Sequence, residues 1–196
     1  MTVPRVEYVL DTSQAFPKGG EWSTAVRGGA AEGVRKALAL VERHHKTQEM
    51  ERGNGAGAAI PDKITRRTGA LARSYSIRHQ RDSLEGSYGS DLKRARLLER
   101  GGTIVPVKAG ALAIPTQAAK HGVGGALGPR AYEGLFRPRG KSYLARRNGD
   151  SLEVMFHLKQ SVTVPARPTL HRTAVATSAE VAAIIADAIK KAMDDA

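Results

Sequence analysis

The chain has 196 residues, with 31 Lys and Arg against 19 Asp and Glu, which gives a formal net charge of +12 at pH 7. It contains no cysteine, which excludes a disulfide framework, a thiolate zinc site and a cysteine nucleophile. Leu, Val, Ile and Phe make up 40 of the 196 residues, the lean edge for a self-sufficient core, so we expect a chain stabilised by assembly.

Membrane and secretory signals are not indicated by the sequence. No apolar run approaches the roughly 20 residues that span a bilayer. The first ten residues are interrupted by Pro4, Arg5 and Glu7, unlike the apolar segment of a signal peptide. We therefore expect one intracellular domain, residues 1–196, that makes no membrane contact.

The first third of the chain predicts one strand and one long helix. Residues 2–10 are rich in Val and Tyr and predict an edge strand. Ser23 is a plausible N-cap, and apolar residues at three- and four-residue steps predict a helix that runs toward Met50. The pair Gly28 and Gly29 should weaken its first turns by roughly 1 kcal/mol per glycine.

Short strands and helical pieces alternate in the middle of the chain. A helical turn leads into a hairpin over residues 74–89. Residues 91–99 predict a helix that a pair of glycines terminates. Residues 103–107 predict an edge strand, because they contain a proline, and a second apolar run follows at 111–114.

An irregular segment then precedes a second hairpin. Residues 116–142 are rich in Gly, Arg and Pro and lack periodicity, which indicates an extended arm or insertion. The apolar runs within residues 143–158 flank Asn148 and Gly149. This dipeptide predicts a hairpin turn in which both central residues have positive φ.

The last segments complete an α+β fold. Residues 161–164 are expected to extend or pair with the sheet of the second hairpin, and an apolar stripe over residues 169–193 predicts a C-terminal helix. We expect a small, mostly antiparallel sheet packed by a long N-terminal helix and a C-terminal helix, with the extended arm at about residues 116–142.

No residue pattern indicates catalysis. His44 and His45 diverge by about 100° on a helix, so they cannot share a metal ion, and we expect them to be surface or half-buried residues. The glycines of residues 122–128 follow no predicted strand, and no Lys-Ser or Lys-Thr pair completes a phosphate loop. A G-x-S-x-G nucleophile elbow is absent from the sequence. We expect a protein that is not an enzyme, with no catalytic residue, no cofactor and no metal ion.

The positive charge is concentrated in the middle of the chain. Residues 61–102 carry a net charge of +5 and residues 103–172 carry +8, whereas residues 173–196 carry −2. Such a surface is either an ordinary solvated one or the binding face for a polyanion. The candidates for polyanion contacts are Arg137, Arg139, Lys141, Arg146 and Arg147.

Three segments, by their order and spacing, resemble one protein family. The first is RTGALARS at residues 67–74. The second comprises RA at 94–95, ERGGTI at 99–104 and ALAIP at 111–115. The third is PARPTL at 165–170, which enters the last helix. This order resembles the phage tail-completion and neck proteins typified by the HK97 gene-product-10 and Mu virion-morphogenesis families.

The resemblance implies a structural protein of the virion, assembled in the host cytoplasm. It would be one subunit of a homo-oligomeric ring at the head–tail junction or the top of the tail, a neck or tail-terminator protein that joins tail to head. Its partners would be adjacent neck or adaptor and tail-tube proteins, with non-specific contact to DNA in the channel. A sixfold ring is expected for a terminator and a twelvefold ring for a portal-proximal adaptor.

The residues that match the family pattern are the candidates for subunit or partner contacts. Arg94 departs from the pattern, because the family usually has Tyr there. For the glycines and the proline, turn geometry without any partner is the competing interpretation. The candidate contact residues are Arg67, Thr68, Gly69, Leu71, Arg94, Glu99, Gly101, Gly102, Arg167 and Pro168.

A second function stays open at this point. The basic middle region also suits a nucleic-acid-binding protein without sequence specificity. Such a protein would bind duplex DNA tightly as a single subunit, with strong salt dependence. The structural hypothesis predicts weak binding by the lone subunit and a ring on its target.

Overall fold

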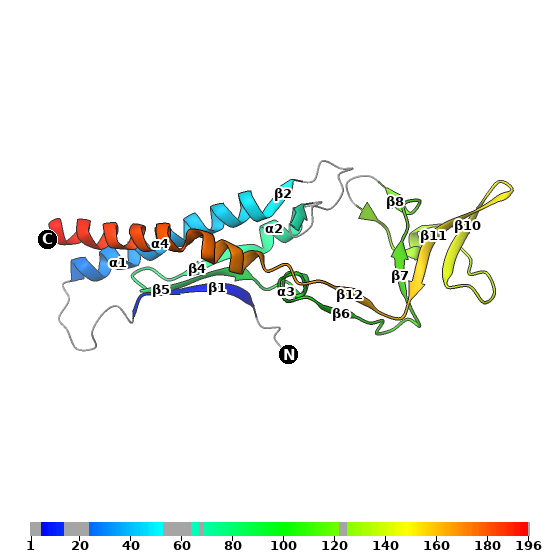
Figure 1. Cartoon of the computed structure of the whole chain (residues 1–196), viewed down its shortest axis with the longest axis horizontal. Coiled ribbons are helices and arrows are strands. Elements are labelled where there is room, and N and C mark those ends of the chain that lie inside the picture. The colour runs from blue at the N-terminus through cyan, green and yellow to red at the C-terminus, as the bar shows by residue number, and fades with distance from the viewer. Residues whose placement is uncertain (1–4, 14–23, 53–63, 67–68, 122–124, 196) are drawn as a thin grey trace.

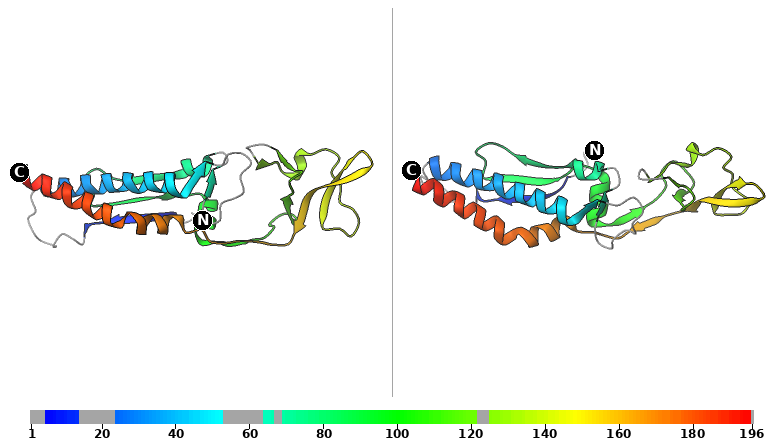
Figure 2. Two further views of the ribbon diagram at one scale, coloured as in Figure 1. Left: turned by 45° about the horizontal axis from the view of Figure 1, so that its top comes forward. Right: turned by 90° about the horizontal axis from the view of Figure 1, so that it is seen from above.

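The computed structural model describes residues 5–13, 24–52, 64–66, 69–121 and 125–195 (Figure 1). The chain is elongated. A body that holds both long helices is joined to a smaller distal lobe by a ladder of two short strands (Figures 1 and 2). The predicted α+β class is confirmed, with the long N-terminal helix packed along the C-terminal helix.

The two long helices run antiparallel along one side of the body (Figure 2). Helix α1 spans Thr24–His44 and continues as a π-helical segment, His45–Glu49, while α4 spans Thr169–Asp194. Gly29 of α1 faces α4 so closely that a Cβ there would lie 2.5 Å from Ala192 Cβ. The glycine expected to weaken the helix therefore permits the close packing of the two helices.

A three-stranded antiparallel sheet lies against α1, in the order β1-β5-β4. Its strands are β1 (Val6–Asp11), β4 (Tyr75–His79) and β5 (Glu85–Ser90). The predicted edge strand and the predicted first hairpin are both confirmed. The body core forms between α1, this sheet and α4, and its largest fully buried side chains include Tyr75, Tyr88 and Leu38.

Short elements close the end of the body that faces the lobe. The predicted helical turn is α2 (Ala70–Ser74), and the predicted middle helix is α3 (Lys93–Arg100), which ends at Gly101 with φ of 67°. A parallel pair completes this end, β2 (Met50–Arg52) with β3 (Ile64–Arg66).

The ladder consists of β6 (Gly102–Ile104) paired antiparallel with β12 (Val162–Val164). The expectation that residues 161–164 join the sheet of the second hairpin is therefore wrong. Strand β11 (Ser151–Lys159) has β10 (Tyr143–Asn148) on one edge and β7 (Leu112–Pro115) on the other, so β12 cannot pair with the strand that precedes it in the chain.

The distal lobe is built on the sheet β10-β11-β7 and has a small core of its own. Ala119 and Tyr132, from the predicted arm at residues 116–142, pack there with Met155 and Phe156. The single small sheet expected from the sequence is thus replaced by separate sheets in body, ladder and lobe. The lobe also contains β8 (Lys120–His121), β9 (Gly125–Ala126) and a 3₁₀ turn at Pro129–Ala131.

The hairpin turn of the lobe differs by one residue from its prediction. Asn148 pairs with Ser151, so Gly149 and Asp150 are the two central residues. Of these residues only Gly149 has a positive φ, 61°. Glycine at the first central position is the mark of a type II′ rather than a type I′ turn.

Candidate functional site

Two of the family-like segments, residues 99–104 and 165–170, meet at one junction between body and ladder. The backbone N–H of Arg167 donates a hydrogen bond to the Leu98 carbonyl at 2.6 Å. A Cβ on Gly101 would lie only 2.8 Å from the Ala166 nitrogen, and its φ of 67° also favours glycine. Both ladder strands therefore leave the body from a tightly packed point.

Glu99 closes this junction from the inside. Its side chain accepts hydrogen bonds from the Thr169 hydroxyl and from the Leu170 N–H, the latter at 3.2 Å to each carboxyl oxygen. Leu170 lies in the first turn of α4, where backbone N–H groups have no partner within the helix, so Glu99 caps α4. The carboxyl group is enclosed, and its contacts lie within the chain.

Burial raises the pKa of the Glu99 carboxyl above its usual range. The hydrogen bonds from Thr169 and Leu170, and the positive charge of Arg172, act in the opposite direction. Arg172 is itself bound by Glu49 at 3.1 Å from its Nε. Desolvation outweighs these contacts, so the neutral form of Glu99 is favoured relative to a carboxyl group in water.

A fully buried histidine extends the network across the body. His45 Nδ1 lies 3.1 Å from the Tyr88 hydroxyl, and its Nε2 lies 3.0 Å from the Thr169 hydroxyl. Its ring also lies 4.7 Å from the ring of Tyr75. Because these side chains are all buried, the network is a structural connection between α1, β5, α3 and α4.

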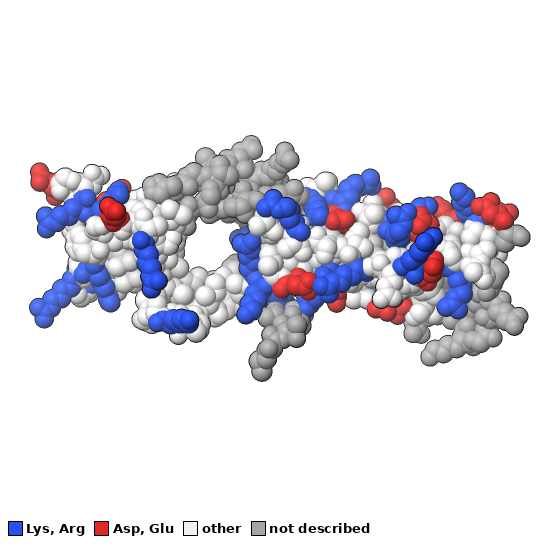
Figure 3. Space-filling view, turned by 180° about the vertical axis from the view of Figure 1, so that it is seen from behind, with Lys and Arg blue, Asp and Glu red and all other residues white. Residues whose placement is uncertain are grey.

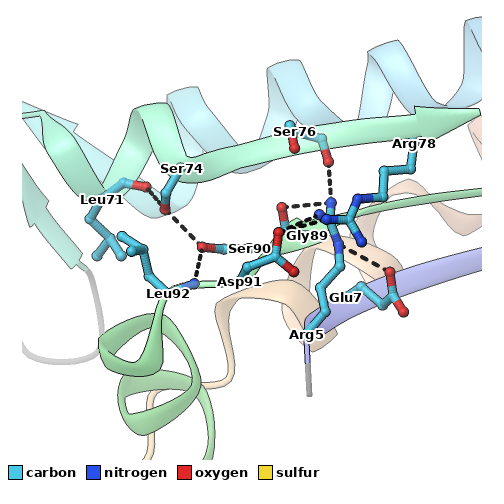
Figure 4. Close-up of polar contacts among 10 residues, drawn as sticks. All are labelled: Arg5, Glu7, Leu71, Ser74, Ser76, Arg78, Gly89, Ser90, Asp91 and Leu92. Atoms are coloured by element: carbon cyan, nitrogen blue, oxygen red, sulfur yellow. Dashed lines mark hydrogen bonds and ion pairs between the residues drawn. The ribbon is translucent and has the colours of Figure 1, made fainter. Parts of the chain in front are cut away.

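The first family-like segment, residues 67–74, contains α2 and connects it to strand β5 of the body sheet (Figure 4). Gly69 begins this turn with φ of 70°, and Leu71 packs partly buried against the body core. The Ser74 hydroxyl lies 2.8 Å from the Ser90 hydroxyl. Gly69 and Leu71 thus serve the fold, while Arg67 and Thr68 lie outside the described residues.

The remaining predicted contact residues lie either at the junction between body and ladder or on the surface. Pro168 occupies the position before the first residue of α4, and Arg167 is half-buried beside it. Gly102 has φ of 154° and begins β6. Arg94 is exposed on α3, and Gly102 and Pro168 are exposed at the junction.

The acidic residue that precedes α3 is held by cations of the neighbouring sheet (Figure 4). Asp91 accepts from Arg78 at 2.7 Å and lies 3.3 Å from Arg5. The Arg5 guanidinium is itself largely buried and also donates to the Gly89 carbonyl at 2.8 Å. Asp91 therefore stabilises the sheet and does not neutralise the cations of α3.

The five predicted polyanion contacts all lie in the distal lobe, spread over a loop and the β10–β11 hairpin. Arg146 is bound by Glu153 at 3.1 Å, and Arg137 donates to the Lys141 carbonyl at 2.9 Å. Within the described ranges, no carboxylate lies at ion-pair distance from Arg139, Lys141 or Arg147, which are exposed.

Aliphatic side chains reach solvent along the ladder and over the lobe. Val107, which follows β6, is 91% exposed. By contrast, the fully enclosed apolar side chains in the described part of the lobe are Ala119, Ala145, Met155 and Phe156. Apart from its low aliphatic content, the sequence contains no signal for this asymmetry. The exposed large apolar residues of ladder and lobe are Ile104, Val105, Val107, Leu127, Phe136 and Leu152.

The described ranges contain neither a metal-binding group of side chains nor a membrane-spanning helix. No three His, Asp or Glu side chains come together there in a group that could hold a metal ion. No helix in that part of the chain is both long and apolar enough to cross a membrane.

Comparison of the chain with protein-family models, with curated proteins and with solved structures gives no match. The assignment of function therefore depends on the residues themselves, on the resemblance of the three segments and on the surfaces described above.

Proposed function

We propose that the chain is a structural subunit of a tailed phage that forms a homo-oligomeric ring at the head–tail junction, as a neck or tail-terminator protein. It acts by assembly and joins the tail to the head. Its partners are copies of itself and the adjacent neck, adaptor or tail-tube proteins.

The observation that supports this proposal best is the exposed apolar surface of the ladder and the lobe. The described part of the lobe encloses four apolar side chains, two of them alanines, while several larger ones on the ladder and the lobe remain in solvent. Exposed apolar side chains that gather on a surface mark interaction sites, and Ile104, Val105 and Val107 follow one another closely at the end of β6. The two-stranded ladder, with its three residue pairs, also leaves backbone groups on its outer edges for a neighbour.

A ring of identical copies would bury this exposed apolar surface. A heterologous contact, in which one patch meets a different patch on the next copy, closes into a ring when the rotation between copies allows it. Each copy then covers the aliphatic surface of its neighbour. The lean core of the single chain is completed by this contact.

Electron microscopy of particles tests the proposal. Particles assembled with the chain should show a ring of it where tail meets head, and cells that lack it should accumulate separate heads and tails. Normal joining without the chain, or its absence from finished particles, would contradict the proposal.

A nucleic-acid-binding protein without sequence specificity is the second candidate. It is favoured by the exposed cations Arg139, Lys141 and Arg147 of the lobe, which no described carboxylate neutralises. This function predicts that the isolated subunit binds duplex DNA tightly. Replacing Arg139, Lys141 and Arg147 with glutamine should then reduce the salt dependence of binding by about one phosphate contact per residue.

A further inference from the structure

Helix α3 carries positive charge that the surrounding structure leaves unneutralised. Lys93, Arg94 and Arg100 are exposed and Arg96 is half-buried. In the described part of the chain, no carboxylate lies within ion-pair distance of any of these four side chains. The two acidic residues beside and within α3 have other partners. Asp91, which precedes α3, binds Arg78 and Arg5, and Glu99, within α3, caps α4.

The long helix α1 provides a contrast. There Arg35 and Lys36 lie 2.6 and 3.6 Å from Glu32, and Lys46 is bound by Glu42. These three cations each have a carboxylate one turn away, whereas in the described ranges no carboxylate lies at ion-pair distance from the four cations of α3.

The α3 cations also form a row. Lys93, Arg96 and Arg100 follow i, i+3 and i+7 spacing, so they share one face, about 110° around the helix from the buried Ala95 and Glu99. This row extends about 10 Å along the helix axis. One strand of duplex DNA presents a phosphate about every 3.4 Å of helix axis, so a row of this length can contact several phosphates.

The row belongs to the end of the body that faces the lobe. In Figure 3, Lys and Arg side chains gather along the edge of the body that borders an opening between the body and the lobe. The described residues of α3 lie at this end of the body, next to the ladder (Figure 1). The positive surface is therefore accessible to a large ligand.

We propose that Lys93, Arg96 and Arg100 bind the phosphate backbone of duplex DNA without reading its sequence. Arg is well suited to this role because its planar guanidinium can contact a phosphate in bidentate fashion. Copies with a charge of +12 repel one another in a ring, and a polyanion inside the ring relieves that repulsion. The proposal rests on the proposed function for the place of contact, the ring channel.

Phosphates explain the row better than an acidic protein face does. Protein interfaces pair their arginines with apolar or aromatic anchors at a desolvated centre. The row has no aromatic residue, and its cations stay solvent-accessible on a helix of eight residues. Backbone binding needs only cations placed along one line.

The test is a titration of the full-length protein with a fluorescein-labelled duplex of about 40 base pairs, at KCl concentrations from roughly 50 to 200 mM. The α3 variant combines Lys93→Gln, Arg96→Gln and Arg100→Gln. We expect it to bind at least about tenfold more weakly and to lower the slope of log K against log salt by about 2 to 3. The single variant Arg100→Gln should lower that slope by about 1.

Two variants with the same loss of three charges serve as matched controls. The α1 control combines Arg35→Gln, Lys36→Gln and Lys46→Gln. The lobe control combines Arg139→Gln, Lys141→Gln and Arg147→Gln. We expect both to bind within about threefold of the wild type at matched salt, and circular dichroism should show that all variants are folded.

Several outcomes overturn the proposal. One is equal weakening by the α1 control, which would mean that only net charge matters. Others are loss of binding in the lobe control with α3 intact, and no duplex binding by the wild type, which would leave an acidic protein as the partner of α3.

The oligomeric state of the same samples separates this proposal from the proposed function. A ring without DNA affinity contradicts the α3 inference and leaves the ring function standing. A monomer that binds duplex DNA through α3 contradicts the ring function alone.

Discussion

At the scale of single residues, the most informative side chain is Glu99. It is enclosed at the junction and caps α4 through the Leu170 N–H and the Thr169 hydroxyl. A buried carboxyl group in this position links body and ladder more tightly than an exposed ion pair would, because its hydrogen bonds do not compete with water. The junction thereby fixes the direction in which the ladder leaves the body.

The raised pKa of Glu99 predicts a pH dependence of stability. Between the pKa of the unfolded chain, near 4.3, and the raised pKa of the folded one, the folded state binds more protons. The free energy of unfolding therefore falls as pH rises through that window. Glu99→Gln, which has no proton to lose, should show a smaller fall when urea unfolding is measured from about pH 4 to about pH 7.

Glu32→Gln is the control of opposite sign. Arg35 lowers the pKa of Glu32, so any stability from this carboxylate is present at neutral pH and is lost as pH falls below about 4. If the Glu99→Gln and wild-type curves were parallel from about pH 4 to about pH 7, the account of Glu99 would be wrong.

Two buried polar residues show the limits of sequence interpretation at this scale. His45 was expected at the surface or half-buried, yet it is fully buried. It lies four residues after Val41, on the apolar face of α1, and this spacing was an available signal. Glu99 likewise lies four residues after the buried Ala95. This spacing predicts that the Glu99 side chain points into the body, but its partners Thr169 and Leu170 are too distant in sequence to predict.

At the scale of elements, the packing of α1 on α4 depends on the absence of side chains. A Cβ on Gly29 would lie 2.5 Å from Ala192 Cβ and 2.8 Å from the Ala188 carbonyl oxygen, whereas Gly28 has open space around it. Gly29→Ala should lower the free energy of unfolding by about 1–3 kcal/mol. Gly28→Ala should raise it by up to about 1 kcal/mol, through helix propensity alone.

Thermal and urea unfolding of these two neighbouring variants measure the difference. Both substitutions add the same methyl group to the same turn, so propensity cancels between them. Equal stability of the two variants would show that α1 and α4 do not pack this closely.

The ladder junction gives a second prediction at the same scale. Gly101→Ala adds a Cβ 2.8 Å from the Ala166 nitrogen at a φ of 67°, so it should cost about 2–4 kcal/mol. Gly134→Ala has nearly the same φ, 69°, but its nearest neighbour is Arg146 Cγ at 4.0 Å. Gly134→Ala should lower the free energy of unfolding by only about 1–2 kcal/mol, from backbone strain alone.

Urea unfolding followed by circular dichroism measures both variants, and the difference between them isolates the close contact at the junction. A Gly134→Ala variant as unstable as Gly101→Ala would mean that backbone strain, not packing against Ala166, accounts for the need for glycine.

Elements defined by local patterns were predictable, and elements defined by distant partners were not. The hairpin of β4 and β5 and the helix α4 follow from alternation, turn residues and periodicity over a few residues. The partner of β12 depends on which sheet edges remain free, a property of the whole lobe. The turn at Gly149 was found, but its register was not, because Asn148 takes part in the β-ladder.

At the scale of the whole molecule, the body and the lobe differ in how much of their apolar surface is buried. The body has a core shared by two long helices and a sheet, whereas the lobe and ladder expose much of their aliphatic surface. The low aliphatic content of the sequence predicted a need for neighbours, but its local charge and periodicity did not show where on the molecule that need lies. The site of the proposed ring contact emerges only from the three-dimensional arrangement.

A pair of substitutions tests whether this surface is used in assembly. Val105→Asp with Val107→Asp places two charges beside the ladder, on side chains that are exposed in the single chain. The variant should fold as the wild type does but form no multi-copy assembly, because charges at the centre of an interface are costly. Size-exclusion chromatography with light scattering measures the effect.

Val175→Asp is the matched control, since Val175 is exposed on α4, away from ladder and lobe. We expect it to assemble normally. Unchanged assembly of the Val105→Asp, Val107→Asp variant would mean that the ladder surface is not the contact between copies.

The central claim is that identical copies complete one another around a channel, and the mass of the purified full-length protein in solution tests it most directly. Native mass spectrometry, supported by electron microscopy of the same sample, should find one closed assembly with a fixed number of copies. A sample that remains monomeric at every concentration, and that is also found as single copies in finished particles, would contradict the claim.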